Sequence, residues 1–176
     1  MILDVIKVRN EFLNSRSEEV EEVTDETRKI LEDMAETMFA EGGIGLAAPQ
    51  VGYGQRLVVV GFPVVDGLAI PSKSDELGPH LQKLVNPRIV SGTGTTTFNE
   101  ACLSVPDIAI KVRRFKTVVI EALDETGTPI RFQAEDLYSV CMQHEIDHLD
   151  GVTLLHKMPG PKRRGYLRRR KRVSGT

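Results

Sequence analysis

The chain has 176 residues, of which 40% are hydrophobic and 27% are charged, a composition typical of one soluble globular domain. Its mean hydropathy of −0.18 excludes a membrane-embedded protein, and two cysteines exclude a disulfide scaffold. The formal net charge of −2 argues against a general polyanion binder. Residues 1–7 contain an acid and a base and no apolar core of a signal peptide, so we expect a cytoplasmic protein with no membrane partner.

Apolar residues recur at helical spacing between Thr24 and the glycine pair at 42–43. Thr24 is a suitable N-cap and two acids follow it, so this pattern predicts an amphipathic N-terminal helix. The Val-rich residues 56–62 predict a buried strand. Residues 63–79 predict a surface loop, because Gly, Pro, Ser and Asp are frequent there.

The second half of the chain predicts three more strands and a helix, at residues 82–90, 116–123, 130–133 and 135–149. The turn residues 124–127 predict that the second and third of these strands form a hairpin. The helix places four side chains on one face: Leu137, Cys141, His144 and His148. A helix, then strands, then a helix predicts an α+β domain.

The run from His144 to His148 carries the strongest chemical signal in the chain. The two histidines lie one helical turn apart, close enough to share a single metal ion, and Glu145 lies beside them without having to be a ligand. This HExxH arrangement indicates a metal site. The alternative is two polar histidines on a solvated helix face.

A mononuclear site needs a third protein ligand. The extended HExxH form would place a histidine at 154, where this chain has Leu154, and no glutamate follows Glu145. Cys141 lies seven residues before His148, about 10.5 Å along a helix axis, which is too far for it to share an ion with both histidines. We therefore expect Cys141 to pack in the core.

Two candidate third ligands remain, His156 and Cys102. We favour Cys102, because an extended segment closed by Pro106 could direct its thiolate at a helix packed across it. A site of one thiolate and two imidazoles leaves a fourth position for water, as catalytic metal sites do.

A glycine-rich segment, residues 42–50, directly follows the first predicted helix. It lacks the Lys-Ser/Thr of a phosphate-binding loop and follows a helix rather than a strand. Its small residues would let another chain approach the backbone, and Gln50 offers an amide donor for an oxyanion. A helix cap followed by a tight turn is the alternative.

Three segments together, residues 43–50, 100–104 and 143–151, resemble the signature motifs of peptide deformylase in their usual order. The resemblance implies an α+β fold with mixed or antiparallel strands packed around the central HExxH helix. It implies a divalent metal, usually Fe²⁺ with Zn²⁺, Ni²⁺ or Co²⁺ as substitutes, held by Cys102, His144 and His148. It also implies removal of the N-formyl group from the initiator methionine of nascent peptides.

The resemblance further implies that Glu145 deprotonates a metal-bound water and later protonates the leaving amine. The metal, the Gln50 side chain and the Leu103 N–H would hold the oxyanion. The substrate would bind as an added strand along residues 43–45. Arg114 matches a family arginine and could steer a peptide carboxylate or backbone carbonyl at the cleft mouth; a surface arginine without such a role is the alternative. The expected substrate-binding residues are Gly43, Ile44, Gly45, Phe98, Glu100, Arg114, Leu137, Val140 and Cys141.

The chain departs from the family pattern at several positions. Ala101 replaces the glycine that usually precedes the cysteine, and Asp136 stands where glycine is frequent. On an extended strand the Ala101 methyl group would point away from the Cys102 face, unless the family's glycine is needed for a positive φ. The 63–79 loop is longer than in many members. The usual N-terminal Pro-Asp and Leu-Arg pairs are replaced by residues 9–10 and 13–14.

Charge is distributed unevenly between the C-terminal residues and the rest of the chain. Residues 157–176 hold nine Lys and Arg and no acid, whereas residues 1–156 hold 14 bases and 25 acids. We expect a catalytic domain at 1–160 and a basic tail at 161–176. The tail is either a solvated end or a contact for ribosomal RNA, because a deformylase meets its substrate at the ribosome.

Two other functions fit the HExxH motif alone. One is a zinc endopeptidase, which would cleave internal peptide bonds. The other is a metal-stabilised binding module without turnover.

Overall fold

The computed structural model describes residues 1–8, 10–61, 64–65, 68–69 and 81–173. Most of the strands follow one another in the middle of the chain, with helices and 3₁₀ helices (η) before and after them. In chain order they are η1 (Glu11–Asn14), α1 (Asp25–Ala40), β1 (Gly45–Ala47), η2 (Ala48–Val51), β2 (Leu57–Gly61), β3 (Val64–Val65), β4 (Leu68–Ala69), β5 (Leu81–Thr93), β6 (Thr96–Cys102), β7 (Val105–Arg114), β8 (Thr117–Leu123), β9 (Pro129–Glu135), α2 (Asp136–Leu149), α3 (Leu154–Lys157) and α4 (Gly160–Val173).

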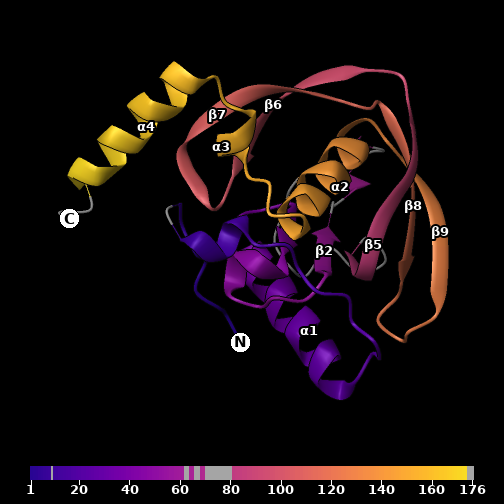
Figure 1. Ribbon diagram of the computed structural model, residues 1–176. Coiled ribbons are helices and arrows are strands. Elements are labelled where there is room, and N and C mark those ends of the chain that lie inside the picture. Colours follow the sequence, from indigo (N-terminus) through magenta and orange to yellow (C-terminus); the bar gives the residue numbers. More distant parts are fainter. Residues whose placement is uncertain (9, 62–63, 66–67, 70–80, 174–176) are drawn as a thin grey trace.

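The central element is a five-stranded antiparallel sheet with the order β1-β2-β5-β8-β9. Val58 and Val60 of β2 pack in the cluster that contains α2, whereas Leu57 and Val59 pack in the cluster that contains α1. Both faces of β2 are therefore covered, and Figure 1 shows this strand between the two helices. A strand buried on both faces needs a continuous apolar run, which is the sequence pattern found here.

Helix α1 forms because its N-terminus is capped and one face is apolar. The Thr24 side chain accepts a hydrogen bond from the Thr27 N–H, and Asp25 and Glu26 lie in the first turn, where the helix dipole favours acids. Its buried apolar side chains are Ile30, Leu31, Met34, Ala35 and Met38. The predicted helix is confirmed.

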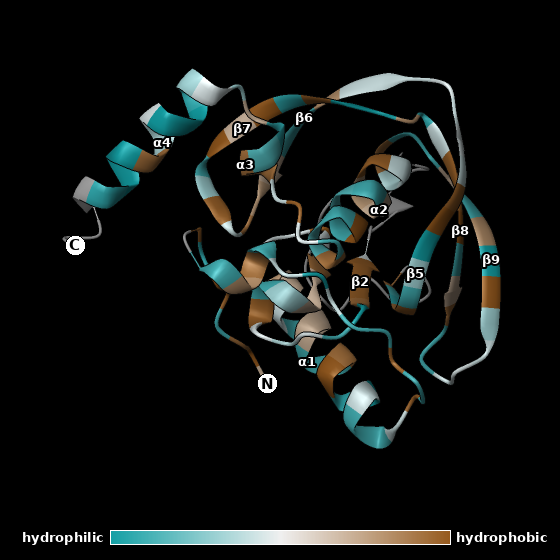
Figure 2. Ribbon diagram, in the orientation of Figure 1, coloured by the Kyte–Doolittle hydropathy of each residue, from teal (hydrophilic) through white to brown (hydrophobic). Residues whose placement is uncertain are grey.

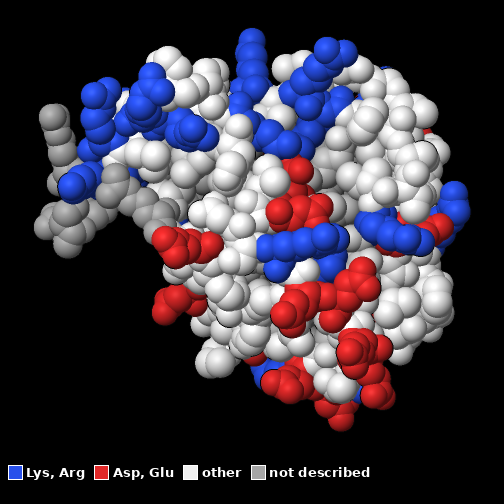
Figure 3. All heavy atoms as spheres, viewed as in Figure 1, with Lys and Arg blue, Asp and Glu red and all other residues white. Residues whose placement is uncertain are grey.

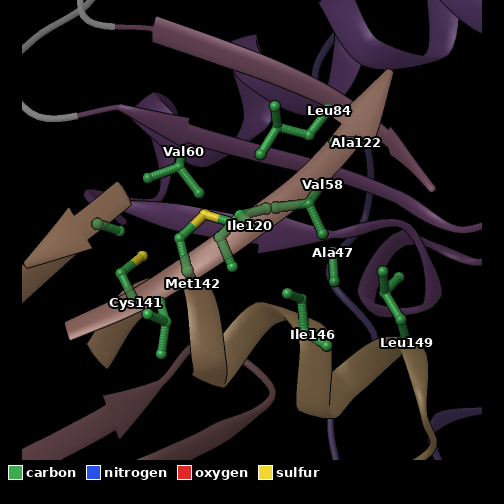
Figure 4. Close-up of a cluster of buried hydrophobic side chains, with 12 residues drawn as sticks. Ala47, Val58, Val60, Leu84, Ile120, Ala122, Cys141, Met142, Ile146 and Leu149 are labelled. Carbon is green, nitrogen blue, oxygen red and sulfur yellow. The ribbon is translucent and has the colours of Figure 1, made fainter. Parts of the chain in front are cut away.

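Helix α2 is buried on two sides that differ in chemistry. Figure 4 shows Met142, Ile146 and Leu149 pointing from the helix into the apolar side chains of the sheet, among them Leu84 and Ile120. The opposite side carries both histidines and lies under the hairpin of β6 and β7, which arches over α2 in Figure 1. The same helix therefore closes the core and presents polar ligands.

The β6–β7 hairpin is a second, separate antiparallel sheet. The sequence analysis did not predict β7. It also treated residues 63–79 as loop, whereas β3 and β4 form a short antiparallel pair there; the rest of that segment lies outside the described residues. Ile108, Ile110 and Val112 alternate along β7, so a strand signal was present in the sequence.

The departures from the family pattern have local explanations. Ala101 is exposed, while its neighbours Glu100 and Cys102 are buried, and it is not among the described residues with a positive φ. Ala101 therefore does not occupy the positive-φ conformation that would require glycine. Asp136 has φ of 48°, a left-handed conformation in which glycine is favoured and aspartate is tolerated.

The basic C-terminal residues form α4, which lies at the edge of the molecule and is mostly hydrophilic (Figures 1 and 2). Tyr166 is nevertheless only 2% exposed, and it packs in the same cluster as Cys102 and Ile110. Its hydroxyl donates a hydrogen bond to the Pro106 carbonyl at 2.9 Å. The helix is thus attached to the hairpin. None of the helices in the described ranges is long and apolar enough to span a membrane.

Gly151 follows α2 and has a backbone conformation in which a residue with a side chain would be strained. Its φ is 74°, and a Cβ atom there would lie 2.5 Å from the Asn14 carbonyl oxygen. We expect Gly151→Ala to lower the free energy of unfolding by about 2 kcal/mol or more, from left-handed strain plus the clash. Urea denaturation at a fixed metal state measures this.

Gly165→Ala is the matched control. Gly165 lies inside α4, and the nearest atom to its added Cβ would be the Arg169 guanidinium at 3.7 Å. We expect this variant to be as stable as the parent or about 0.5–1 kcal/mol more stable. Equal denaturation midpoints for Gly151→Ala and the parent would contradict the strain assigned to Gly151.

Candidate metal centre

The three predicted ligands lie close together where the β6–β7 hairpin packs against α2. Cys102 ends β6, and His144 and His148 lie one turn apart on α2. Their ligand atoms lie within 4.8 Å of one another. The Cys102 Sγ is 3.3 Å from the His148 Nε2, which is 3.2 Å from the His144 Nε2. One soft donor and two borderline donors this close fit a single divalent cation such as iron or zinc.

His156, the other candidate third ligand, lies elsewhere. Its Nδ1 accepts a hydrogen bond from the Thr153 N–H at 3.0 Å, so it caps α3. It does not belong to the metal-competent group found within the described residues.

The electrostatic environment favours a thiolate at Cys102. Burial raises the pKa of this thiol, but the neighbouring His148 and His144 outweigh burial and hold the pKa well below its ordinary value of 9.0. The thiolate is the form that binds metals. Cys141 behaves in the opposite way, because burial and the nearby Glu145 raise its pKa well above 9.0. Cys141 therefore stays a thiol, and it packs in the core as expected.

Glu100 orients the first histidine. Its Oε2 lies 2.8 Å from the His144 Nδ1, so the Nδ1–H donates to the carboxylate and the Nε2 lone pair is left for a metal. Burial opposes ionisation of Glu100, but Arg114 and His144 lower its pKa to about 2. Glu100 is therefore a carboxylate at neutral pH.

Arg114 forms a bidentate ion pair with Glu100. Its Nε and Nη2 donate to the two Glu100 oxygens at 2.8 and 2.9 Å, and its Nη1 donates to the Asp147 Oδ2 at 2.5 Å. Arg114 is 7% exposed and does not line the cavity that opens in front of Cys102. Its guanidinium is committed to two carboxylates, so the expected role in steering a peptide carboxylate at the cleft mouth does not fit its position.

Among the carboxylates of the described residues, Glu145 combines burial with an unused oxygen beside the candidate metal ligands. It is 4% exposed, and its Oε2 has no hydrogen-bond partner within the described residues. Burial raises the pKa of Glu145, although the two histidines oppose this. A Cβ atom on Gly45 would lie 2.5 Å from the Glu145 Oε1, so the glycine backbone passes directly against this carboxylate. Glu145 is therefore a candidate for proton transfer beside the metal-competent group.

Gln50 is held so that its amide nitrogen faces the ligands. Its Oε1 accepts a hydrogen bond from the Ala47 N–H at 2.9 Å, which fixes the amide. Its Nε2 then donates to the Ser104 Oγ at 3.3 Å and lies 3.7 Å from the Cys102 Sγ. Leu103 follows Cys102 in the turn between β6 and β7.

A cavity of about 590 Å³ opens in front of these residues. With the exception of Arg114, every predicted substrate-binding residue lines it. These are Gly43, Ile44, Gly45, Phe98, Glu100, Leu137, Val140 and Cys141. The cavity is also lined by Pro106, Asp107, Ile108 and Ala109 of β7, which the sequence analysis missed because it did not predict that strand.

The family model described as polypeptide deformylase matches residues 2–164. The chain belongs to the peptide deformylase family. This confirms the resemblance drawn from the three motifs. Peptide deformylases remove the N-formyl group from nascent peptides, so the chain is a hydrolase of formylated peptides, and a zinc endopeptidase is not favoured.

Relatives and solved structures of deformylases resemble the chain over nearly its whole length. The peptide deformylase of Pseudoalteromonas translucida is 39% identical over 168 residues, 96% of this chain and 93% of that protein. The structure of the Ehrlichia chaffeensis peptide deformylase in complex with actinonin has a TM-score of 0.87 and 34% identity and covers 99% of each chain. The Met-Ala-Ser-bound Acinetobacter baumannii peptide deformylase has a TM-score of 0.80 and 26% identity and covers 90% of this chain and 99% of that one.

Replacing Cys102 by Ala should empty the metal site of this deformylase. Two imidazoles alone bind a divalent cation weakly, so we expect metal per chain to fall from about one to near zero after dialysis. Elemental analysis of the purified protein measures it. His156→Ala is the control, which we expect to retain full metal content. The reverse pattern would move the third ligand to His156.

Proposed function

We propose that this peptide deformylase hydrolyses the formyl amide of N-formylmethionyl nascent peptides with Glu145 as general base and then general acid. The observation that carries this proposal is the buried Glu145 carboxylate, whose Oε2 has no partner within the described residues, beside the Cys102, His144 and His148 donors. A divalent cation held by these three residues, with Fe²⁺ proposed as native and Zn²⁺, Ni²⁺ or Co²⁺ as substitutes, would lower the pKa of a bound water.

Glu145 would take the proton from the attacking water and pass it to the leaving amine. Its raised pKa keeps the proton available for the second transfer. The Gln50 amide and the Leu103 N–H would donate to the oxygen that gains negative charge in the transition state. The Gln50 amide is already fixed by Ala47, so it needs little reorganisation to do so.

The substrate would bind as an added strand along β1. This strand is at one end of the sheet order, and no strand in the described part of the chain pairs with its outer edge, where an extended peptide could add. The methionine side chain would occupy the apolar part of the cavity, formed by Leu137, Val140 and Phe98. Phe98 is 41% exposed at this cavity, as expected of an aromatic residue that a substrate would cover.

Glu145→Gln tests the general base. The amide keeps the size of the side chain but cannot accept the proton, so we expect turnover of a formyl-Met peptide to fall by about 10²–10⁴-fold with metal content retained. Formate release by the metal-loaded protein under anaerobic conditions measures this. Full activity of the variant would contradict the role. If the metal-loaded parent protein cleaved internal peptide bonds without releasing formate, the result would favour an endopeptidase.

We also propose that α4 contacts ribosomal RNA in the cytoplasm, where the substrate emerges. Figure 3 shows Lys and Arg side chains gathered over α4. Arg164, Arg168 and Lys171 are exposed and lie at i, i+4 and i+7, on the side of the helix away from the buried Tyr166. Such a row of cations can contact successive phosphates.

The double variant Arg164→Gln/Arg168→Gln tests the ribosome contact. We expect weaker ribosome binding and a salt-dependence slope, log of affinity against log of salt, that is shallower by up to about 2. Turnover of small formyl peptides should be unchanged. Deletion of α4 is a poorer test, because it also removes Tyr166 from the cluster that contains Cys102.

The control is Arg88→Gln/Arg131→Gln, which removes the same charge from two exposed arginines on the central sheet. Equal ribosome affinity and slope for the α4 variant, the control variant and the parent would reject the contact.

A further inference from the structure

We propose that residues 6–8 are a positioning segment that sets the placement of the two oxyanion donors, Gln50 and Leu103, relative to each other. This inference rests on the roles proposed above for those two residues. It concerns the N-terminal segment, which does not line the cavity.

The segment binds the backbone on both sides of the proposed oxyanion site. The Ile6 N–H donates to the Gln50 carbonyl at 2.7 Å, and the Val8 N–H donates to the Ser104 carbonyl at 2.8 Å. Between them the Lys7 ammonium donates to the Leu103 carbonyl at 3.1 Å. Three consecutive residues therefore hold the two turns that carry the donors.

The two turns belong to different parts of the fold. Gln50 lies in η2, which follows β1 of the central sheet, whereas Leu103 lies between β6 and β7 of the separate hairpin sheet. No strand pairing joins the two sheets in the described ranges. The Gln50 side chain links them directly through two long contacts, from its Nε2 to the Ser104 Oγ at 3.3 Å and to the Cys102 Sγ at 3.7 Å. The backbone bonds of residues 6–8 are shorter and span both turns.

The segment is itself anchored at both ends. Before the contacts, the Leu3 N–H donates to the Thr37 Oγ1 of α1 at 2.9 Å, and Leu3 and Val5 pack against the α1 cluster. At the other end, Val8 packs against the cluster that contains Cys102. A displacement of the hairpin relative to the sheet would have to break these contacts.

Placement of this kind affects the transition state more than the ground state. Oxyanion donors act only when they reach the position of the developing charge, and errors of about 1 Å cost orders of magnitude in rate. The apolar residues proposed to hold the methionine side chain, Leu137, Val140 and Phe98, lie outside the two segments that residues 6–8 bind. Loss of the contacts made by residues 6–8 should therefore lower kcat and leave KM nearly unchanged.

Lys7→Met tests the segment at an accessible side chain. Lys7 is 44% exposed, so the variant should fold, and methionine keeps the apolar stem but removes the donor to Leu103. With a formyl-Met peptide we expect kcat to fall on the order of fivefold and KM to change by less than about twofold. A fall in kcat of at least about twofold is the minimum that the inference requires. Metal content and melting temperature should be unchanged, and Lys7→Arg should restore kcat.

Glu41→Gln is the matched control, because Lys7 also lies 3.9 Å from the Glu41 carboxylate. We expect this variant to keep kcat, which would show that the Leu103 carbonyl is the contact that matters. A loss equal to that of Lys7→Met would assign the effect to the ion pair and overturn the inference.

A double-mutant cycle with Gln50→Ala separates this inference from the proposed function. If Lys7 acts by placing the oxyanion donors, Lys7→Met should cost less in the Gln50→Ala background than in the parent. Multiplicative effects, or a fall in kcat below twofold for Lys7→Met, would overturn the positioning role while the loss caused by Gln50→Ala upheld the oxyanion site. Unchanged kcat for Gln50→Ala would overturn both.

Discussion

The site depends on one constraint, which is that α2 is buried on two opposite sides. Met142, Ile146 and Leu149 fill the core against the sheet, so the helix cannot rotate without exposing them. This fixes the direction in which His144 and His148 point. The histidines are then held rigidly under the hairpin that carries Cys102, and a rigid element is what a metal site of defined geometry requires.

The candidate ligands are joined to a chain of hydrogen bonds and ion pairs. The Cys102 thiolate adjoins the two histidines, His144 donates to Glu100, and Arg114 bridges Glu100 and the partly buried Asp147. The Arg114 guanidinium and the His144 N–H offset the cost of burying the Glu100 carboxylate. Glu145 stands outside this chain with one oxygen unpaired within the described residues. That difference separates Glu100, which is hydrogen-bonded to His144, from Glu145, the carboxylate proposed to move a proton.

The turn between β6 and β7 is held from two directions. The N-terminal segment binds the Leu103 and Ser104 carbonyls. Helix α4 binds the Pro106 carbonyl through Tyr166, and Arg170 pairs with Asp107 at 2.8 Å. Both ends of the chain therefore support the wall of the cavity. The sequence analysis assigned the α4 residues to a basic tail, because Lys and Arg dominate this segment and only a few of its residues pack against the hairpin.

The sequence by itself determined the local elements and the chemistry of the residues. Helical spacing placed His144 and His148 on one face of α2, and the buried run of β2 was legible, because both patterns depend on neighbours in the chain. The sequence favoured Cys102 over His156 as third ligand, but only the tertiary structure brought Cys102 beside both histidines and placed His156 elsewhere. Only the tertiary structure placed Arg114 against Glu100 and Asp147 rather than at the cleft mouth. Contacts between residues tens of positions apart have no local signature in one sequence. They are decided by how the hairpin packs across α2.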